Sequence, residues 1–265
     1  MIENNLSPIL FSIDFFGGSI DIRVYSIVFL IGTILIYYIL QKNKEKFNMK
    51  EKEVDNLIFF IFINMILFAR FFNVIFYNPR YYLNNLSEIL KIWRGGLSLH
   101  GGIIGFIIIL SIYSKKKEFS IFNFLNFIIT PITFILGLGR IANFFNHEIV
   151  GIETDVFWCV LFDGYSGCRH PTQLYESILW FLILFIILVN EKVLSKKLFE
   201  NKVVFTIITY STFRFFIEFL KDFETIGIFT MGQSLSLLTM IVTVYFYRVK
   251  ILKSSNNLTK NKKSN

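Results

Sequence analysis

A glycine-rich stretch around a single histidine is the first candidate for chemistry. Residues 95–105 hold five glycines and His100. Each glycine weakens a helix by roughly 1 kcal/mol relative to alanine, so the run predicts a close approach to the backbone. The approaching group could be an anion bound by amides or a second helix. Histidine is a common proton-transfer residue, so His100 is either a proton-transfer group or a structural hydrogen-bonding residue.

A second stretch, residues 137–151, concentrates polar groups at the end of an apolar segment. Arg140, Asn143, His147 and Glu148 lie within nine residues. Arginine's planar fork suits phosphate or carboxylate, and an ionisable side chain at membrane depth is a functional candidate by default. If the stretch is helical, Arg140 shares a face with Asn143 and His147, so Arg140 could hold a phosphate, Asn143 orient it and Glu148 fix the arginine. The alternative is a salt bridge that only locks a helix end.

A third stretch, residues 170–176, reads as a proline-fixed turn that enters an apolar segment. Thr172 is placed to cap the helix, and Glu176 lies near its first turn, where a negative charge is favoured. We predict a mainly structural role here, with His170 and Glu176 supporting a site rather than forming it.

A fourth stretch puts Tyr210, Arg214 and Glu218 on one helical face, at successive spacings of four residues. This stripe is either a structural salt bridge or a polar wall that faces a substrate cavity. Tyr25, near the start of the first apolar segment, has the default interpretation of an interfacial aromatic residue.

The composition places these stretches in a membrane protein. Of the 265 residues, 54% are hydrophobic and 17% are charged, whereas about 25% are charged in soluble domains. Seven apolar stretches approach the ~20 residues that cross a bilayer as a helix. We therefore predict an all-α polytopic membrane protein with seven transmembrane helices. The predicted spans are 24–40, 54–77, 96–113, 121–139, 174–190, 203–220 and 231–247.

Lysine and arginine set the predicted orientation. Of the 27 basic residues, 18 lie on one side of the predicted membrane, in 41–53, 114–118, 191–202 and 248–265. That side is cytoplasmic by the positive-inside rule, so the C-terminus is inside and the N-terminus outside. Seven of the other nine are arginines, which predicts that chemistry with an anion occurs outside. Residues 1–250 then form one domain with a small outer head mainly within 140–173, and 251–265 form a disordered tail.

Several other functions are disfavoured. The cations flank apolar segments and form no groove, so we predict no nucleic-acid binding. Three histidines and two cysteines are too scattered for a metal site, and no motif indicates a cofactor. A transporter should show an internal repeat, and none is visible in the sequence. An intramembrane protease needs a serine or aspartate nucleophile that faces its base, and Ser98, near His100, is the only candidate. Cys159 and Cys168 lie in the outer loop, where a disulfide is possible.

Residues 139–151 resemble the signature of the bacterial prolipoprotein diacylglyceryl transferases. The stretches 95–102, 170–176, 210–218 and 231–236 also resemble that family and occur in its order, so the resemblance covers about 25–247. It implies a seven-helix enzyme of the bacterial inner membrane with its active site on the periplasmic side. Its substrates would be phosphatidylglycerol, a membrane lipid, and prolipoprotein signal peptides with a lipobox cysteine. The diacylglyceryl group would pass to the cysteine thiol, leaving a thioether and releasing glycerol phosphate, as the first step of lipoprotein maturation.

The resemblance also implies roles for single residues. The family's essential histidine falls on His100 and its two essential arginines on Arg140 and Arg214. The arginines would neutralise the phosphate, and His100 would act as general base toward the thiol. The family's supporting site residues fall on Tyr25, Asn143, Glu148, Gly151, Tyr210 and Glu218.

The sequence departs from the family's pattern at three places. His147 stands where a small residue is usual and adds a second titratable group. Residues 219–224 replace a Pro-Asp element, and the segment 152–169 is short and holds both cysteines.

Overall fold

The computed structural model describes residues 2–15, 18–92, 96–193, 201–223 and 225–263. The predicted glycine-rich stretch is described from Gly96 onward, so Trp93, Arg94 and Gly95 lie outside the described residues. Two compact units are present, one of residues 1–33 with 126–265 and the other of residues 34–125.

Helices dominate the described residues, and five of them are long and apolar enough to cross a membrane. They correspond to five predicted spans, so a helical, multi-pass membrane protein is confirmed. The other two predicted spans are also helical, in α4 (Leu99–Lys117) and α8 (Met231–Lys263), and the count of seven spans stays a prediction. The five are α1 (Val24–Lys42), α2 (Glu51–Phe72) with the π-helical η2 (Asn73–Tyr77), α5 (Ile121–Phe145), α6 (Thr172–Val193) and α7 (Lys202–Ile217) with the 3-10 helix η5 (Glu218–Leu220).

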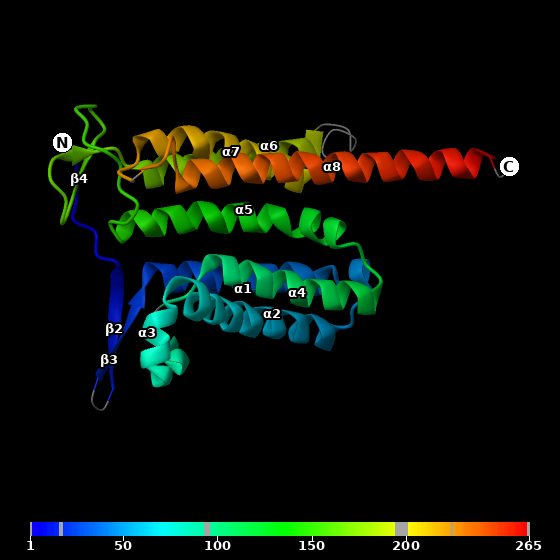
Figure 1. The fold of residues 1–265 in the computed structure, drawn as a ribbon, viewed down its shortest axis with the longest axis horizontal. Coiled ribbons are helices and arrows are strands. Elements are labelled where there is room, and N and C mark those ends of the chain that lie inside the picture. Colours follow the sequence, from blue (N-terminus) through cyan, green and yellow to red (C-terminus); the bar gives the residue numbers. More distant parts are fainter. Residues whose placement is uncertain (1, 16–17, 93–95, 194–200, 224, 264–265) are drawn as a thin grey trace. The chain divides into compact units, whose positions relative to one another are not determined.

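In the unit of residues 1–33 and 126–265, the axes of α5, α6, α7 and α8 lie nearly parallel, and α5 and α6 run in opposite directions along the chain (Figure 1). Leu179, Trp180, Ile183 and Ile187 recur at helical spacing on α6 and form a buried core with apolar residues of α7. A Cβ at Gly137 would lie 2.9 Å from the Phe181 ring, so α5 and α6 approach closely there. These helices carry most of the predicted site.

Short strands outside the helices correct the all-α prediction. Strand β1 (Ile2–Asn4) pairs in parallel with β4 (Val160–Phe162), and β4 pairs antiparallel with β5 (Cys168–Arg169). A disulfide joins Cys159 to Cys168, as the loop placement allowed. Two- and three-residue strands are too short to show an alternating pattern, which is why the sequence did not predict them. Two hairpins complete the set: β2 (Ile9–Phe15) with β3 (Gly18–Arg23), and β6 (Thr225–Ile226) with β7 (Phe229–Thr230).

Helix α8 continues to Lys263, into the polar segment that the composition predicts to be disordered. Extending an existing helix requires no new nucleus, so helical backbone can persist beyond the apolar residues. That residues 251–265 form a disordered tail stays a prediction.

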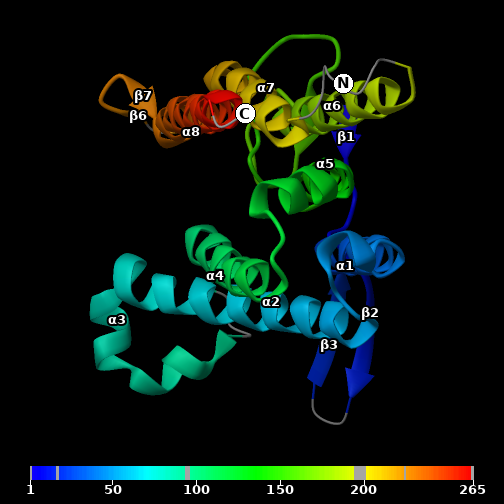
Figure 2. The ribbon, with the colours of Figure 1, turned by 90° about the vertical axis from the view of Figure 1, so that its right-hand side faces the viewer.

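In the unit of residues 34–125, α2 and α4 lie side by side (Figure 2). A Cβ at Gly101 would overlap the carbonyl of Phe68, and one at Gly105 would overlap the carbonyl of Asn64. These two glycines therefore serve close helix packing, the second of the two interpretations given above. The unit is completed by η1 (Lys44–Phe47), α3 (Pro79–Asn84) and η3 (Leu86–Leu90).

Candidate active site

A buried carboxylate, Glu176 on α6, lies at the centre of a cluster of charges. Arg140 Nε lies 2.8 Å from Glu176 Oε2, and Arg214 Nη1 lies 3.1 Å from both carboxylate oxygens. Lys221, directly after η5, donates its ammonium to the same carboxylate. Glu176 thus joins cations from α5, from α7 and from the residue after η5, and through these contacts it holds the predicted Arg140 and Arg214.

The second buried carboxylate is Glu218, at the start of η5. Its Oε2 lies 3.5 Å from Arg214 Nη2 and 3.3 Å from Lys221 Nζ, and its Oε1 accepts a hydrogen bond of 3.1 Å from the Thr230 hydroxyl. A Cβ at Gly232 would overlap the Glu218 carboxylate. The late stretch 231–236 therefore needs its glycine to leave room for this side chain.

Tyr210 connects the two arginines to Glu176. Its hydroxyl donates to Glu176 Oε2 over 2.8 Å and accepts from Arg140 Nη2 over 3.0 Å and from Arg214 Nη1 over 3.3 Å. The ring stacks on Trp180, with centroids 4.1 Å apart. Within the predicted stripe, Tyr210 and Arg214 thus contact α6, and Glu218 contacts Arg214 and Thr230.

The charges of this cluster do not cancel. Three cations, Arg140, Arg214 and Lys221, face two carboxylates, so the cluster carries a formal charge of +1. Both carboxylates are almost fully buried, whereas the side chains of Arg140 and Arg214 keep 20% and 22% of their surface exposed. Burial lowers the pKa of Lys221, and the charge of Glu176 opposes that shift. A partly dry site with an unmatched positive charge and exposed guanidinium groups is suited to bind an anion.

A second set of polar contacts extends from Arg140 toward the start of α1. Arg140 Nη1 donates to Asn143 Oδ1 over 3.2 Å, and Asn143 Nδ2 donates to Glu148 Oε2 over 3.1 Å. The Tyr25 hydroxyl accepts from Asn143 and donates to Glu148 Oε2 over 3.2 Å. Glu176, and not Glu148 as predicted, pairs directly with Arg140; Glu148 acts on it through Asn143. Tyr25 is part of this network and more than an interfacial aromatic residue.

The loop after α5 has an unusual backbone conformation around Glu148. Helix α5 ends at Phe145, so His147 does not continue the helical face of Arg140. His147 and Ile149 have positive φ angles of 54° and 57°, which non-glycine residues rarely adopt. The His147 Nε2 atom is buried and has no hydrogen-bond partner among the described residues. This geometry turns the chain sharply on both sides of Glu148.

Gly151 lies where three segments of backbone meet. Its N–H donates to the His170 carbonyl over 3.0 Å, and a Cβ would lie 2.6 Å from that oxygen and 2.7 Å from the Leu220 carbonyl. Any larger residue would push the end of η5, and with it Lys221, away from the loop. Gly151 therefore shapes the site through packing of the backbone.

The start of α6 is tied to the same loop. Thr172 is the first residue of α6, and its hydroxyl donates to the Ile149 carbonyl over 2.7 Å, in place of the predicted capping role. Gln173 Nε2 donates to the Glu148 carbonyl over 2.5 Å. His170 Nδ1 lies 3.0 Å from the Tyr175 hydroxyl, and burial lowers the pKa of His170. The stretch 170–176 thus holds the Glu148 loop while it contributes Glu176.

His100 belongs to the unit of residues 34–125. It lies in the first turn of α4 and is exposed, and its Nδ1 lies 3.0 Å from the hydroxyl of Tyr77 on η2. The contacts that join Tyr25, Arg140 and the other predicted residues all lie in the unit of residues 1–33 and 126–265. The structure thus brings eight of the nine predicted site residues into one connected region and gives His100 a local partner of its own.

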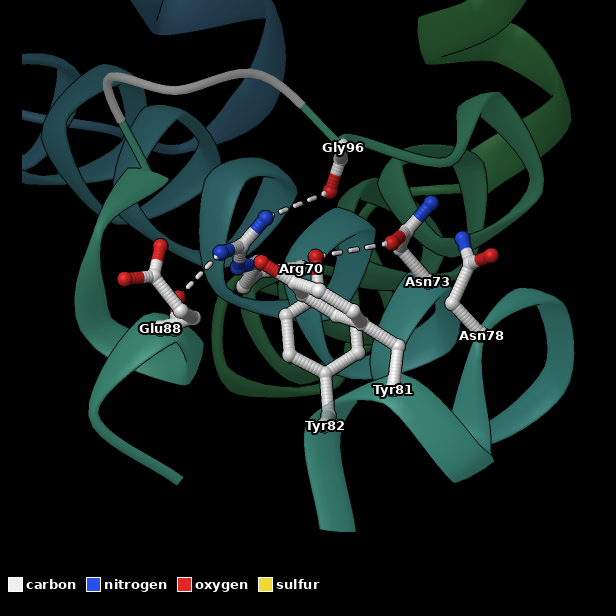
Figure 3. Close-up of a pocket in the computed structure, with 7 residues that line it drawn as sticks. All are labelled: Arg70, Asn73, Asn78, Tyr81, Tyr82, Glu88 and Gly96. Carbon is white, nitrogen blue, oxygen red and sulfur yellow. Dashed lines mark hydrogen bonds between the residues drawn. The ribbon is translucent and has the colours of Figure 1, made fainter. Parts of the chain in front are cut away.

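Arg70 donates hydrogen bonds to the backbone of the segment that precedes His100. Its guanidinium donates to the carbonyls of Ile89, Gly96 and Glu88 over 2.9, 3.1 and 2.5 Å, and it lies over the ring of Tyr82. Figure 3 shows this arginine at the wall of a hollow of about 490 Å³. The buried cation is satisfied by backbone carbonyls, which indicates a structural role.

No group of histidine, cysteine and acidic residues suited to a metal ion occurs among the described residues.

Known proteins are similar to this chain over most of its length. The family model "Prolipoprotein diacylglyceryl transferase" matches residues 8–249. The chain belongs to this family. A phosphatidylglycerol–prolipoprotein diacylglyceryl transferase of Buchnera aphidicola is 36% identical, over 93% of this chain and 97% of that protein. Relatives of the same name from Actinobacillus pleuropneumoniae and Vibrio parahaemolyticus are 38% and 32% identical, with 88% and 92% of this chain covered and 89% and 92% of theirs.

Two residues of the cluster in this family member were not predicted as site residues. Glu176 was assigned to the helix start, because a carboxylate near a first turn has that simpler explanation. Lys221 carried a usable signal: it follows Glu218 by three residues and so continues the stripe of Tyr210, Arg214 and Glu218. It is also one of only two lysines among the nine basic residues that lie off the predicted cytoplasmic side.

Proposed function

We propose that the protein transfers the diacylglyceryl group of phosphatidylglycerol to the thiol of the lipobox cysteine in a prolipoprotein signal peptide. Family membership and the names of the relatives support this reaction. The observation in the structure that carries it is the cluster of three cations and two carboxylates, whose two arginines stay partly exposed. A phosphodiester carries one negative charge, which matches the formal +1 of the cluster.

The arginines act on the leaving group. The cysteine sulfur attacks the glyceryl carbon, a C–S bond forms, and the C–O bond to the phosphate breaks with its electron pair going to the phosphate. Glycerol phosphate leaves, and a thioether remains. Arg140 and Arg214 bind the phosphate oxygens and stabilise the charge that develops on them. Glu176 and Tyr210 hold both guanidinium groups in place before the lipid arrives.

His100 takes the proton of the thiol. A cysteine thiol has a pKa of about 8.5, so only a small fraction is thiolate at neutral pH. An imidazole with a pKa near neutrality is matched to this transfer. His100 is exposed at the start of α4, where a substrate can reach it.

The protein resides in the bacterial inner membrane with seven spans, its C-terminus in the cytoplasm and its site on the periplasmic side. The lysine-rich segments support this orientation. The disulfide between Cys159 and Cys168 supports an oxidising compartment for the loop that carries β4 and β5. Phosphatidylglycerol, a membrane lipid, and the signal helix then both enter sideways from the bilayer.

The reaction is tested by measuring transfer from labelled phosphatidylglycerol to a lipobox peptide with purified full-length protein in phospholipid nanodiscs. A matched peptide with serine in place of the cysteine serves as control. Label that reaches the cysteine peptide and resists hydroxylamine, as a thioether does, supports the proposal. Failure of the folded protein to label the cysteine peptide would contradict it.

Replacing His100 with glutamine should lower kcat about 10²- to 10⁴-fold, the usual contribution of a general base, with little change in protein level. His147→Asn is the matched control, because asparagine tolerates the left-handed conformation found at His147. We expect the control to stay within about threefold of the original rate, because the His147 ring packs on Phe162 and not on the charged cluster. Turnover of His100→Gln near the original rate would remove His100 from the mechanism and leave the role of the arginines intact.

A further inference from the structure

Tyr77 is the one described side chain recorded in hydrogen-bond contact with the His100 ring. The Tyr77 hydroxyl lies 3.0 Å from His100 Nδ1. A neutral imidazole carries its proton on either Nδ1 or Nε2. The hydrogen-bond partner of one nitrogen decides whether the other nitrogen is protonated. A general base needs an unprotonated nitrogen toward its substrate. The Tyr77 contact can therefore set whether His100 is able to act as a base.

The position of His100 relative to Tyr77 is fixed by backbone packing. Gly101 allows α4 to lie directly on the carbonyl of Phe68 in α2, and Ser98 N donates to the Ala69 carbonyl over 3.0 Å. Ser98 also caps α4, because its hydroxyl accepts from Gly101 N over 3.4 Å. The first turn of α4 therefore cannot slide along α2. The glycines and Ser98 place His100 at a set height beside the end of α2.

Tyr77 reaches His100 from an unusual turn. It is the last residue of the π-helical η2, in which Asn78 N donates to the Asn73 carbonyl over 3.1 Å. A π-helical turn contains an extra residue, so the side chains that follow point in a different direction from those on a regular α-helix, and such turns are frequent at functional sites. The Tyr82 hydroxyl donates to Asn73 Oδ1 over 3.3 Å beside Arg70, which Figure 3 shows. The start of the turn is thereby held.

We propose that Tyr77 is a positioning residue for His100: its hydroxyl oxygen accepts the proton on Nδ1 and leaves Nε2 free to take the proton of the substrate thiol. The inference rests on the base role of His100 in the proposed function. After the transfer, both ring nitrogens carry protons, and the Nδ1 hydrogen bond strengthens because its donor is now charged. Tyr77 thus both selects the active tautomer and stabilises the imidazolium.

The test combines a spectroscopic and a kinetic readout on full-length protein in phosphatidylglycerol-containing nanodiscs. Nitrogen chemical shifts of 15N-labelled histidine report which ring nitrogen is protonated. The chain has three histidines, so the signal of His100 is assigned by its loss in His100→Gln. Tyr77→Phe removes only the hydroxyl. Tyr81→Phe is the matched control: Tyr81 is 52% exposed, against 54% for Tyr77, and lies four residues away.

We expect neutral His100 to carry its proton on Nδ1 in the original protein and to shift toward the Nε2 form in Tyr77→Phe. In the same variant kcat should fall about tenfold, as loss of one hydrogen bond implies, while KM for the lipid stays within about twofold. Tyr81→Phe should change neither the spectrum nor kcat. A purely structural role for Tyr77 would lower the amount of folded protein without altering the tautomer.

Two results would overturn the inference: a proton on Nε2 in the original protein, or an unchanged kcat in Tyr77→Phe. If His100→Gln is inactive and Tyr77→Phe is fully active, only this inference fails. If His100→Gln keeps its activity, the base role fails first, and Tyr77 then has no base to position.

Discussion

Replacing Arg140 with alanine should lower kcat/KM for lipid transfer about 10³-fold, because the guanidinium acts where charge develops on the leaving phosphate. The variant retains Arg214 and Lys221 against Glu176 and Glu218, so the formal charge of the cluster falls from +1 to zero. A neutral cluster holds a phosphodiester less well, and KM for phosphatidylglycerol should rise as kcat falls. Neither carboxylate loses all of its cationic partners, so the variant should remain folded.

The measurement is the steady-state transfer rate as a function of the fraction of phosphatidylglycerol in the bilayer. Arg140→Lys separates charge from geometry: lysine keeps the charge but lacks the fork, and we expect it to recover only part of the rate. Arg80→Ala, at an exposed arginine on α3, is the matched control. The role of Arg140 would be refuted if Arg140→Ala kept the original kcat/KM in a folded state.

The extent of the helices was largely predictable from hydropathy, because a bilayer demands long apolar segments. The predicted span 24–40 corresponds to α1, Val24–Lys42, and 121–139 corresponds to α5, Ile121–Phe145. The extra turns of α5 matter, since they carry Arg140 and Asn143 on helix rather than in a loop. The mean hydropathy falls where polar residues begin, whereas helical hydrogen bonds continue beyond that point. The apolar pattern therefore does not predict this extension.

The candidate site was predictable where spacing along one helix creates it. Tyr210, Arg214 and Glu218 share a face by periodicity alone, and they meet in the structure as expected. The pairing of Arg140 with Glu176 was not predictable, because it joins α5 to α6 and depends on how the two helices pack. The sequence offered Glu148 as a partner only because it is near in the chain. Contacts between helices thus required the fold, whereas contacts within a helix did not.

Replacing Glu176 with glutamine should cause the largest loss of stability among single changes at this site. Glu176 has no exposed surface and contacts Arg140, Arg214 and Lys221. Glutamine has nearly the same shape but no charge, so three cations would face the single carboxylate Glu218. Removing one partner of a buried ion pair costs about 3–5 kcal/mol, because the remaining charges stay buried without compensation.

The matched control is Glu153→Gln, which removes the same charge from a glutamate in the same unit. The Glu153 side chain is 58% exposed and lies 3.5 Å from Arg169, which keeps Asp222 as a second carboxylate partner at 2.9 Å, so the loss of this charge should cost about 0–1 kcal/mol. The thermal midpoint of unfolding, followed by tryptophan fluorescence in nanodiscs, should therefore fall clearly for Glu176→Gln and little for Glu153→Gln. Added phosphatidylglycerol should restore part of the loss in Glu176→Gln, because the phosphate supplies a negative charge to the same guanidinium groups. Equal midpoints for the two variants would show that Glu176 does not balance the three cations, and a midpoint that does not respond to the lipid would show that phosphate and Glu176 do not share them.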